Sequence, residues 1–347
     1  MTLTRFSQEK TESDPAKLRD SLVTLERNCA ADWLKRGDVQ ERFGLAYGEH
    51  GLFEEAGMHY ELAAKSEDLE NASSLRAIEQ RINLEARFGG TTGKKTKIEQ
   101  AIQRGAHLLA LGETSERLNI MGSAHKRLAA LQANPKDVKA ALAKARDCYR
   151  RAAEKQEAEP LADPYPIVNW LAIEALLGNA KVPYESWLSK AEILGRQRFQ
   201  TRCQAWDLFA IADIAVVRSY LDGSLPDKRS SLVETYERVF AESAATKRER
   251  DSARGQLAFL MSMRGKLTRA DGDKKKGDAI LNTLEAIIKH LERSENQRTG
   301  VAASPAASPS PSPAKPSPKR TTRRKLASKK PLRQPRRKKK QSPNEPR

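Results

Sequence analysis

Apolar residues recur about every 3.6 positions from about residue 14 to residue 294, and this period restricts the chain to helices. The last segment shows it clearly, because one helical face collects Ile280, Leu284, Ile287, Ile288 and Leu291. Alternating runs of Val, Ile and Thr are scarce, so few strands are expected. Short interruptions rich in Gly and Pro divide the period into about twelve helices. The sequence therefore predicts an all-α fold of short amphipathic helices joined by short loops.

One stretch carries the spacing of a helical hairpin repeat. Small Gly44 is followed by Tyr47, Ala56, Tyr60 and Ala63. Small residues let two helices cross closely, while the tyrosines fill the space on either side. This order and spacing resembles a tetratricopeptide repeat. The resemblance predicts a solenoid of αα-hairpins, with a bundle without repeats as the alternative.

A second stretch repeats the pattern with an insertion. Gly122 stands at the small position, and Ala145, Tyr149 and Ala152 reproduce the spacing of the second helix. The interval from Gly122 to Ala145 is eleven residues longer than that from Gly44 to Ala56. We expect the extra residues, around "QANPKDV" (132–138), to lengthen the turn between the two helices.

The repeats divide the chain into three predicted parts. Residues 1–36 are expected to form an N-terminal helical cap, and residues 37–294 a tetratricopeptide-like repeat domain. Residues 295–347 are rich in Pro, Ser, Lys and Arg. Such a composition buries too little apolar area to offset the chain entropy, so we expect this tail to be disordered.

The tail also carries most of the net charge. Of the formal charge of +18, residues 301–347 contribute +14, from fifteen Lys and Arg against the single acid Glu345. Such a tail can neutralise phosphates and release counterions, so we expect contact with DNA, RNA or another polyanion. The alternatives are a solubilising tail or a targeting signal. The candidate contact residues are the clustered cations Arg323, Arg324, Lys325, Lys329, Lys330, Arg336, Arg337, Lys338, Lys339 and Lys340.

Signatures of catalysis are missing from the sequence. No two of the five histidines have metal-ligand spacing, and no pair of Cys forms a Cys-x-x-Cys motif. The glycine-rich stretch 88–96 fails the phosphate-loop pattern, which needs Gly at Phe88 and Ser or Thr at Lys95. We therefore expect no enzyme, no cofactor and no metal, and read 88–96 as an interhelical loop.

The sequence also bears on the cellular compartment of the protein. The longest strongly apolar stretch, 205–217, is interrupted by Asp207 and Asp213 and is too short to cross a bilayer. Three distant cysteines are typical of a reducing compartment. The expectation is a cytoplasmic protein with no membrane contact.

The element Tyr165-Pro166-x-x-Asn169 follows the second repeat. It resembles the Tyr-Pro-x-x-Asn element of a divergent tetratricopeptide family. That family includes the helical regulatory region of apoptosis-signal-regulating kinases and bacterial repeat proteins associated with effector domains. The resemblance covers about residues 37–290, although Ile167 stands where family members usually have Gly. It implies a mainly structural role for the three motif residues.

Three functions follow as hypotheses. The resemblance implies a non-catalytic adaptor or regulatory scaffold in signalling or defence, which docks a protein partner such as an effector encoded on another chain. The second hypothesis is a sensor that binds a nucleotide-like anionic ligand in the solenoid groove, near the hairpin at 163–178. The third is a nucleic-acid-binding protein that acts through its tail.

Overall fold

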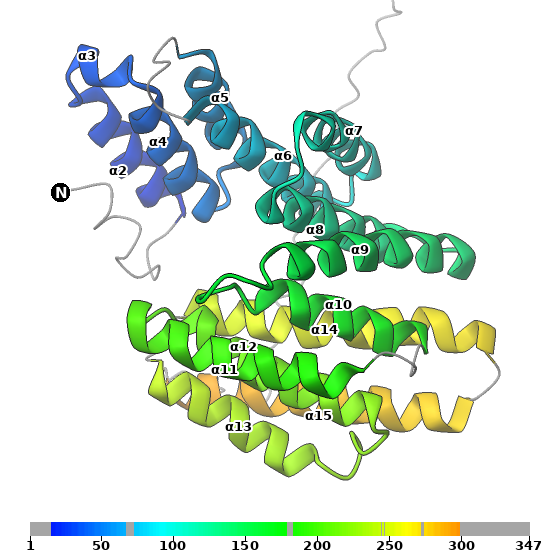
Figure 1. Ribbon diagram of the computed structural model, residues 1–347. Helices are drawn as coiled ribbons and strands as arrows, with labels where there is room; N and C mark the ends of the chain where they lie inside the picture. The colour runs from blue at the N-terminus through cyan, green and yellow to red at the C-terminus, as the bar shows by residue number, and fades with distance from the viewer. Residues whose placement is uncertain are drawn as a thin grey trace, which may run out of the picture. The chain divides into compact units, whose positions relative to one another are not determined.

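The computed structural model describes residues 15–66, 73–178, 183–243, 245, 247–271 and 274–298. These ranges are all-α and contain fourteen helices, against about twelve expected, and no strand. The fold is a tetratricopeptide-like helical solenoid (Figure 1). The predicted cap, 1–36, includes α2 (Pro15–Arg27) and α3 (Ala31–Leu34). The tail residues of the prediction lie outside the described ranges, apart from 295–298 at the end of α15 (Lys274–Arg298).

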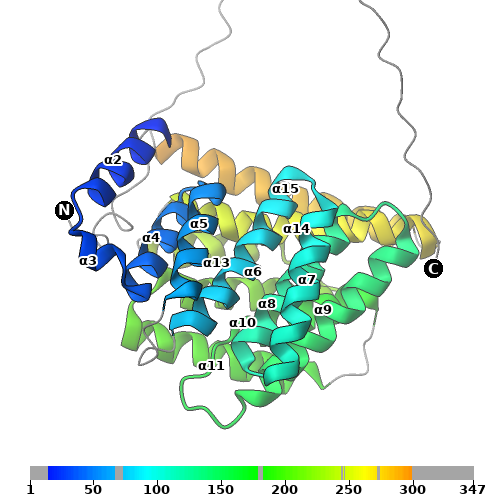
Figure 2. The same cartoon turned by 90° about the horizontal axis from the view of Figure 1, so that it is seen from above.

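The first half of the repeat domain is a run of consecutive helices, each of which packs on the next. They are α4 (Gly37–Glu49), α5 (Phe53–Lys65), α6 (Ser73–Thr92), α7 (Lys95–Leu111), α8 (Ser115–Leu131) and α9 (Pro135–Lys155). Alternate helices also touch, α4 with α6 and α6 with α8, as stacked hairpins require (Figure 2).

The second half folds back on the first. It consists of α10 (Tyr165–Leu177), α11 (Tyr184–Arg202), α12 (Ala205–Leu221), α13 (Arg229–Glu242), α14 (Lys247–Asp271) and α15. Helix α14 packs against α15 and also against α8, α9, α10 and α12. Each repeat of an open solenoid contacts only its neighbours, so the return of α14 departs from that pattern and supplies one side of a partly open cavity.

Glycine packing holds the two repeat hairpins closed. A Cβ on Gly44 would lie 2.9 Å from the Tyr60 ring, and one on Gly122 would lie 3.0 Å from the Tyr149 ring. Both tyrosines are buried, with 3% and 0% of their surface exposed. Each glycine therefore lets the two helices of its hairpin pack so closely that only the tyrosine ring lies between the glycine and the second helix.

The longer second hairpin corrects the sequence prediction. Its turn spans only residues 132–134, so it is as long as the turn of the first hairpin, residues 50–52. The eleven extra residues extend the helices instead, four at the end of α8 and seven at the start of α9. Asn134 begins α9 by accepting a hydrogen bond from the Lys136 amide at 2.9 Å.

The interhelical loop expected at 88–96 is shorter than predicted, because α6 continues through Gly89 and Gly90 to Thr92 and α7 begins at Lys95. A Cβ on Gly89 would lie 2.7 Å from Ile98 Cγ1 and 2.9 Å from the Lys94 carbonyl oxygen. Close approach of α7, rather than a helix end, accounts for glycine here.

We predict that Gly122→Val destabilises the fold by about 1–3 kcal/mol, because the added methyl groups must displace the Tyr149 ring. Gly57→Val is the matched control, since a Cβ on Gly57 meets only Leu84 Cδ2, at 4.0 Å. Urea unfolding of both variants measures the difference. Equal midpoints for the two would contradict the packing account.

Candidate functional site

A cavity of about 630 Å³ lies among α8, α10, α12 and α14. Helix α8 supplies Lys126 and Arg127, α10 supplies Tyr165 and Asn169, and α14 closes one side with Gln256 and Phe259 among others. The segment from Arg198 to Asp213 forms the remaining wall. The cavity is thus lined by cations, amides, carboxylates and aromatic rings together.

Lys126 is the central cation of this cavity. Its Nζ donates to Asn169 Oδ1 at 2.8 Å and to Gln256 Oε1 at 2.5 Å, and it lies 4.5 Å from the centre of the Phe259 ring. Within the described ranges no carboxylate forms an ion pair with it. Loss of hydration, with a smaller contribution from Arg127, lowers the Lys126 pKa to about 7.

Asn169 places that cation. Its side chain is 3% exposed, and its Nδ2 donates to the Tyr165 carbonyl oxygen at 3.0 Å, one turn earlier in α10. That bond turns Oδ1 toward Lys126. The buried amide thus has one backbone partner, and it also orients the cavity's main cation.

The other two motif residues, Tyr165 and Pro166, differ in how far they are buried. Pro166 is buried in the first turn of α10, while Tyr165 is 42% exposed and lines the cavity. The Tyr165 ring meets the Tyr149 ring edge-on at 5.7 Å, and their hydroxyls lie 3.3 Å apart. The motif therefore touches both the repeat packing and the cavity.

Helix α10 begins directly after Asp163 and Pro164. Pro164 is the capping residue, and the helix begins at Tyr165. Asp163 still accepts the Tyr165 amide hydrogen at 2.9 Å through Oδ1. A carboxylate here satisfies a free amide of the first turn from just outside the helix.

A buried ion pair stiffens the far wall. Arg198 Nε donates to Asp207 Oδ1 at 2.8 Å, and Arg198 Nη1 donates to the Leu161 carbonyl oxygen at 2.8 Å. Arg198 thereby ties α11 to α12 and to the loop before α10. Trp206 is 44% exposed and lies next to this pair on the cavity wall.

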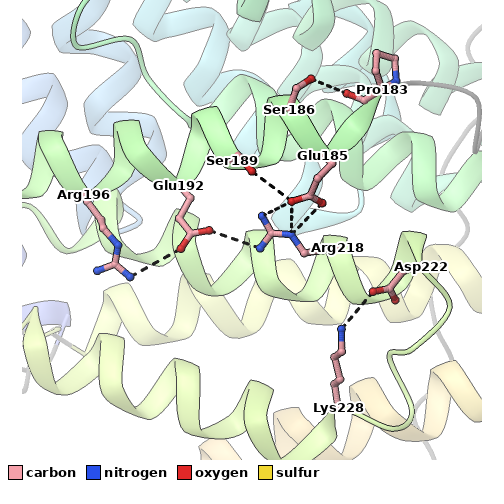
Figure 3. A network of polar contacts seen from close by, with 9 residues as sticks. All are labelled: Pro183, Glu185, Ser186, Ser189, Glu192, Arg196, Arg218, Asp222 and Lys228. Carbon is pink, nitrogen blue, oxygen red and sulfur yellow. Dashed lines mark hydrogen bonds and ion pairs between the residues drawn. The ribbon is translucent and has the colours of Figure 1, made fainter.

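The helices of that wall are joined by a second, more exposed network (Figure 3). Arg218 of α12 lies between two acids of α11, donating to Glu185 at 3.1 Å and pairing with Glu192 at 3.6 Å. Glu192 also pairs with Arg196 at 3.9 Å. Exposed pairs contribute little singly, so their main effect is to fix the register of α11 on α12.

Asp213 of α12 is the remaining acid on the wall. The Tyr236 hydroxyl donates to Asp213 Oδ1 at 2.6 Å, and Tyr236 is fully buried. Loss of hydration raises the Asp213 pKa to about 6, although the Tyr236 bond and Lys126 both act to lower it. Asp213 is therefore mainly ionised at neutral pH.

The residues named for repeat packing lie apart from the cavity. They form the interiors of two hairpins, the first from Gly44, Tyr47, Ala56, Tyr60 and Ala63, and the second from Gly122, Ala145, Tyr149 and Ala152. The cations named for polyanion contact, 323–340, lie outside the described residues. Among the described residues no cluster of three or more His, Cys, Asp or Glu suits a metal ion.

Sequence reasoning missed Lys126, Asp213, Gln256 and Phe259. Lys126 and Gln256 are 130 positions apart, so no local spacing brings them together. The one available signal was Asn169, a polar residue in an apolar helix, which indicated that a polar partner was needed.

Residues 52–176, or 125 of 347, match the family model described as Tetratricopeptide Repeats-Sensor. This region is a tetratricopeptide-like repeat. The match begins at the start of α5, ends in α10, and includes Lys126, Tyr165 and Asn169. No curated protein matches the chain. The finer resemblance to the regulatory region of apoptosis-signal-regulating kinases stays a prediction.

Tetratricopeptide repeats generally mediate protein interactions, so the match supports a helical repeat sensor or scaffold. None of the helices in the described ranges has both the length and the apolar character needed to span a bilayer.

We predict that Asn169→Ala lowers the free energy of unfolding by about 1–3 kcal/mol, because it leaves Lys126 with one fewer partner in dehydrated surroundings. Gln204→Ala, on the same cavity wall but with an exposed side chain, is the control and should change stability little. Denaturant titration compares the two. An unchanged midpoint for Asn169→Ala would show that its bonds do not stabilise the fold.

Proposed function

We propose that this chain is a non-catalytic helical-repeat sensor and scaffold, whose cavity binds a small anionic ligand of nucleotide-like chemistry. The observation that supports this most is Lys126, a cation on the cavity wall whose two hydrogen-bond partners are neutral amide oxygens. A dehydrated cation without a carboxylate is stabilised when an anion binds beside it.

The other groups of the cavity suit the rest of such a ligand. Arg127 adds a second cation on the same helix, while exposed Tyr165 and Trp206 offer aromatic faces. A cavity of about 630 Å³ falls within the usual range for small-molecule sites, which combine apolar walls with a few fixed polar groups.

The scaffold part of the proposal is docking of a protein partner in the cytoplasm, such as an effector on another chain. It is supported by the tetratricopeptide match and by exposed apolar side chains on the first hairpin. Leu45, Met58 and Leu62 are 47%, 60% and 52% exposed on α4 and α5. Exposed apolar groups are typical of surfaces that another protein covers.

A thermal-shift assay on the full chain tests ligand binding. AMP and ATP are expected to raise the melting midpoint, since a ligand that binds only the folded state stabilises it, by about 2.7 kcal/mol at a hundredfold excess over Kd. Lys126→Gln should abolish the shift. Lys144→Gln removes an exposed lysine of α9 and should retain it. Equal shifts in all three proteins would place binding outside the cavity.

The pH dependence of binding gives a second prediction. A bound anion raises the Lys126 pKa above its free value of about 7. Below pH 7, Lys126 is charged in both the free and the anion-bound protein. Above pH 7, Lys126 of the free protein is mostly neutral and must take up a proton when the anion binds. Affinity for AMP should therefore fall between pH 7 and pH 9, by up to about tenfold per unit, as calorimetry can measure. An affinity that rises or stays level over this range would contradict the role of Lys126.

The basic tail is proposed to contact nucleic acid. We predict that the full chain binds duplex DNA with an affinity that falls steeply as salt increases, because each neutralised phosphate releases a counterion. A chain ending at residue 296 should lose this binding. Filter binding across a salt series measures both, and a flat dependence on salt would rule out phosphate contacts.

A further inference from the structure

The same cavity contains an acid that the proposed anion site does not use, and the inference drawn from it rests on that proposed function. Asp213 lies on α12 and lines the cavity with Lys126 of α8. The residue is partly exposed and lies on the cavity wall, although its carboxyl group has lost much of its hydration.

Asp213 is held in one orientation. The buried Tyr236 hydroxyl bonds Oδ1 at 2.6 Å, and within the described ranges Oδ2 has no hydrogen-bond partner. A carboxylate oxygen fixed this way is an acceptor that awaits a donor.

Most other charged groups of the cavity already have partners. Arg198 pairs with Asp207, Arg127 donates to Ser123 Oγ, and Asp163 accepts the Tyr165 amide. Lys126 and Asp213 form no ion pair with each other. Among the described residues Asp207 Oδ2 also accepts no hydrogen bond, but it is fully buried. The cavity therefore presents Lys126 as a cation without an ion pair and Asp213 Oδ2 as an acceptor without a donor, and a bound molecule can satisfy both.

We propose that the ligand of this cavity is dipolar, with an anionic group that binds Lys126 and an amino or hydroxyl group that donates to Asp213. An anion alone would leave the Asp213 carboxylate without a donor and would lie in its repulsive field. A ligand with both groups satisfies the two charges at once, so Asp213 is a specificity-determining residue of the site.

Two matched pairs of probes test this on the full chain. O-phosphoethanolamine and ethyl phosphate share the phosphate and differ in the amino group. AMP and purine riboside 5′-monophosphate differ only in the amino group of the base. In at least one of the two pairs, we expect wild type to bind the probe that carries the amino group about tenfold more tightly than the probe that lacks it. A hydrogen bond to a charged group gives a difference of this size.

Asp213→Asn is the variant to compare. Its side-chain oxygen can still accept from Tyr236, so its NH₂ group would replace the free acceptor with a donor. The preference for the amino-bearing probe should disappear, with affinity for ethyl phosphate kept or increased. Isothermal calorimetry, or ligand-observed NMR for the weak probes, gives the ratios.

The outcomes separate the two proposals. Phosphate probes that bind wild type equally with and without an amino group would overturn the dipolar ligand and leave the anion site standing. An equal loss of both members of a pair in Asp213→Asn would also overturn it. If no probe binds wild type, or if Lys126→Gln binds them as wild type does, the anion site and the dipolar ligand fall together. The comparison of probes with and without an amino group uses wild type alone, so it does not depend on whether a variant folds.

Discussion

Lys126 joins three helices that lie far apart in the sequence, and the rest of the site depends on this junction. Its Nζ bonds Asn169 of α10 and Gln256 of α14 while its own backbone lies in α8. A second lysine, Lys266 of α14, reinforces the closure by donating to the carbonyl oxygens of Ala130 and Gln132 at the end of α8. Together they hold α14 against α8, so that the helical array forms a partly open cavity.

The junction is physically demanding because Lys126 is a cation in dehydrated surroundings that forms no ion pair with any carboxylate of the described residues. Amide oxygens and the Phe259 ring stabilise it only in part, and the Lys126 pKa of about 7 reflects the remaining cost. A bound anion removes that cost. The contact of Tyr165 with Tyr149 then gives a direct link from the cavity to the packing of the second hairpin, where Tyr149 lies against Gly122. The cavity wall and the packing of the second hairpin are therefore in direct contact.

Local spacing predicts the helices and their repeat class, and it fails where contacts are distant or where helix length varies. Small Gly44 and large Tyr60 lie within one hairpin, so the pattern that joins them is visible in the sequence. The extra residues after Gly122 were placed in a turn because spacing alone does not distinguish a longer turn from longer helices. Asn169 belongs to a motif that the sequence shows, but its partner Lys126 comes from a helix two elements earlier, and the second partner of Lys126, Gln256, comes from α14. No sequence period records such contacts.

We propose that Lys126 is a dehydrated cation that receives an anion, and its protonation tests this most directly. NMR of chains with ¹³C-labelled lysine, assigned with Lys126→Gln, measures the Lys126 pKa directly. It should be about 7 in the free protein and should rise when AMP is added. A Lys126 pKa near the ordinary value of about 10.4, unchanged by AMP, would show that Lys126 is neither dehydrated nor the anion site.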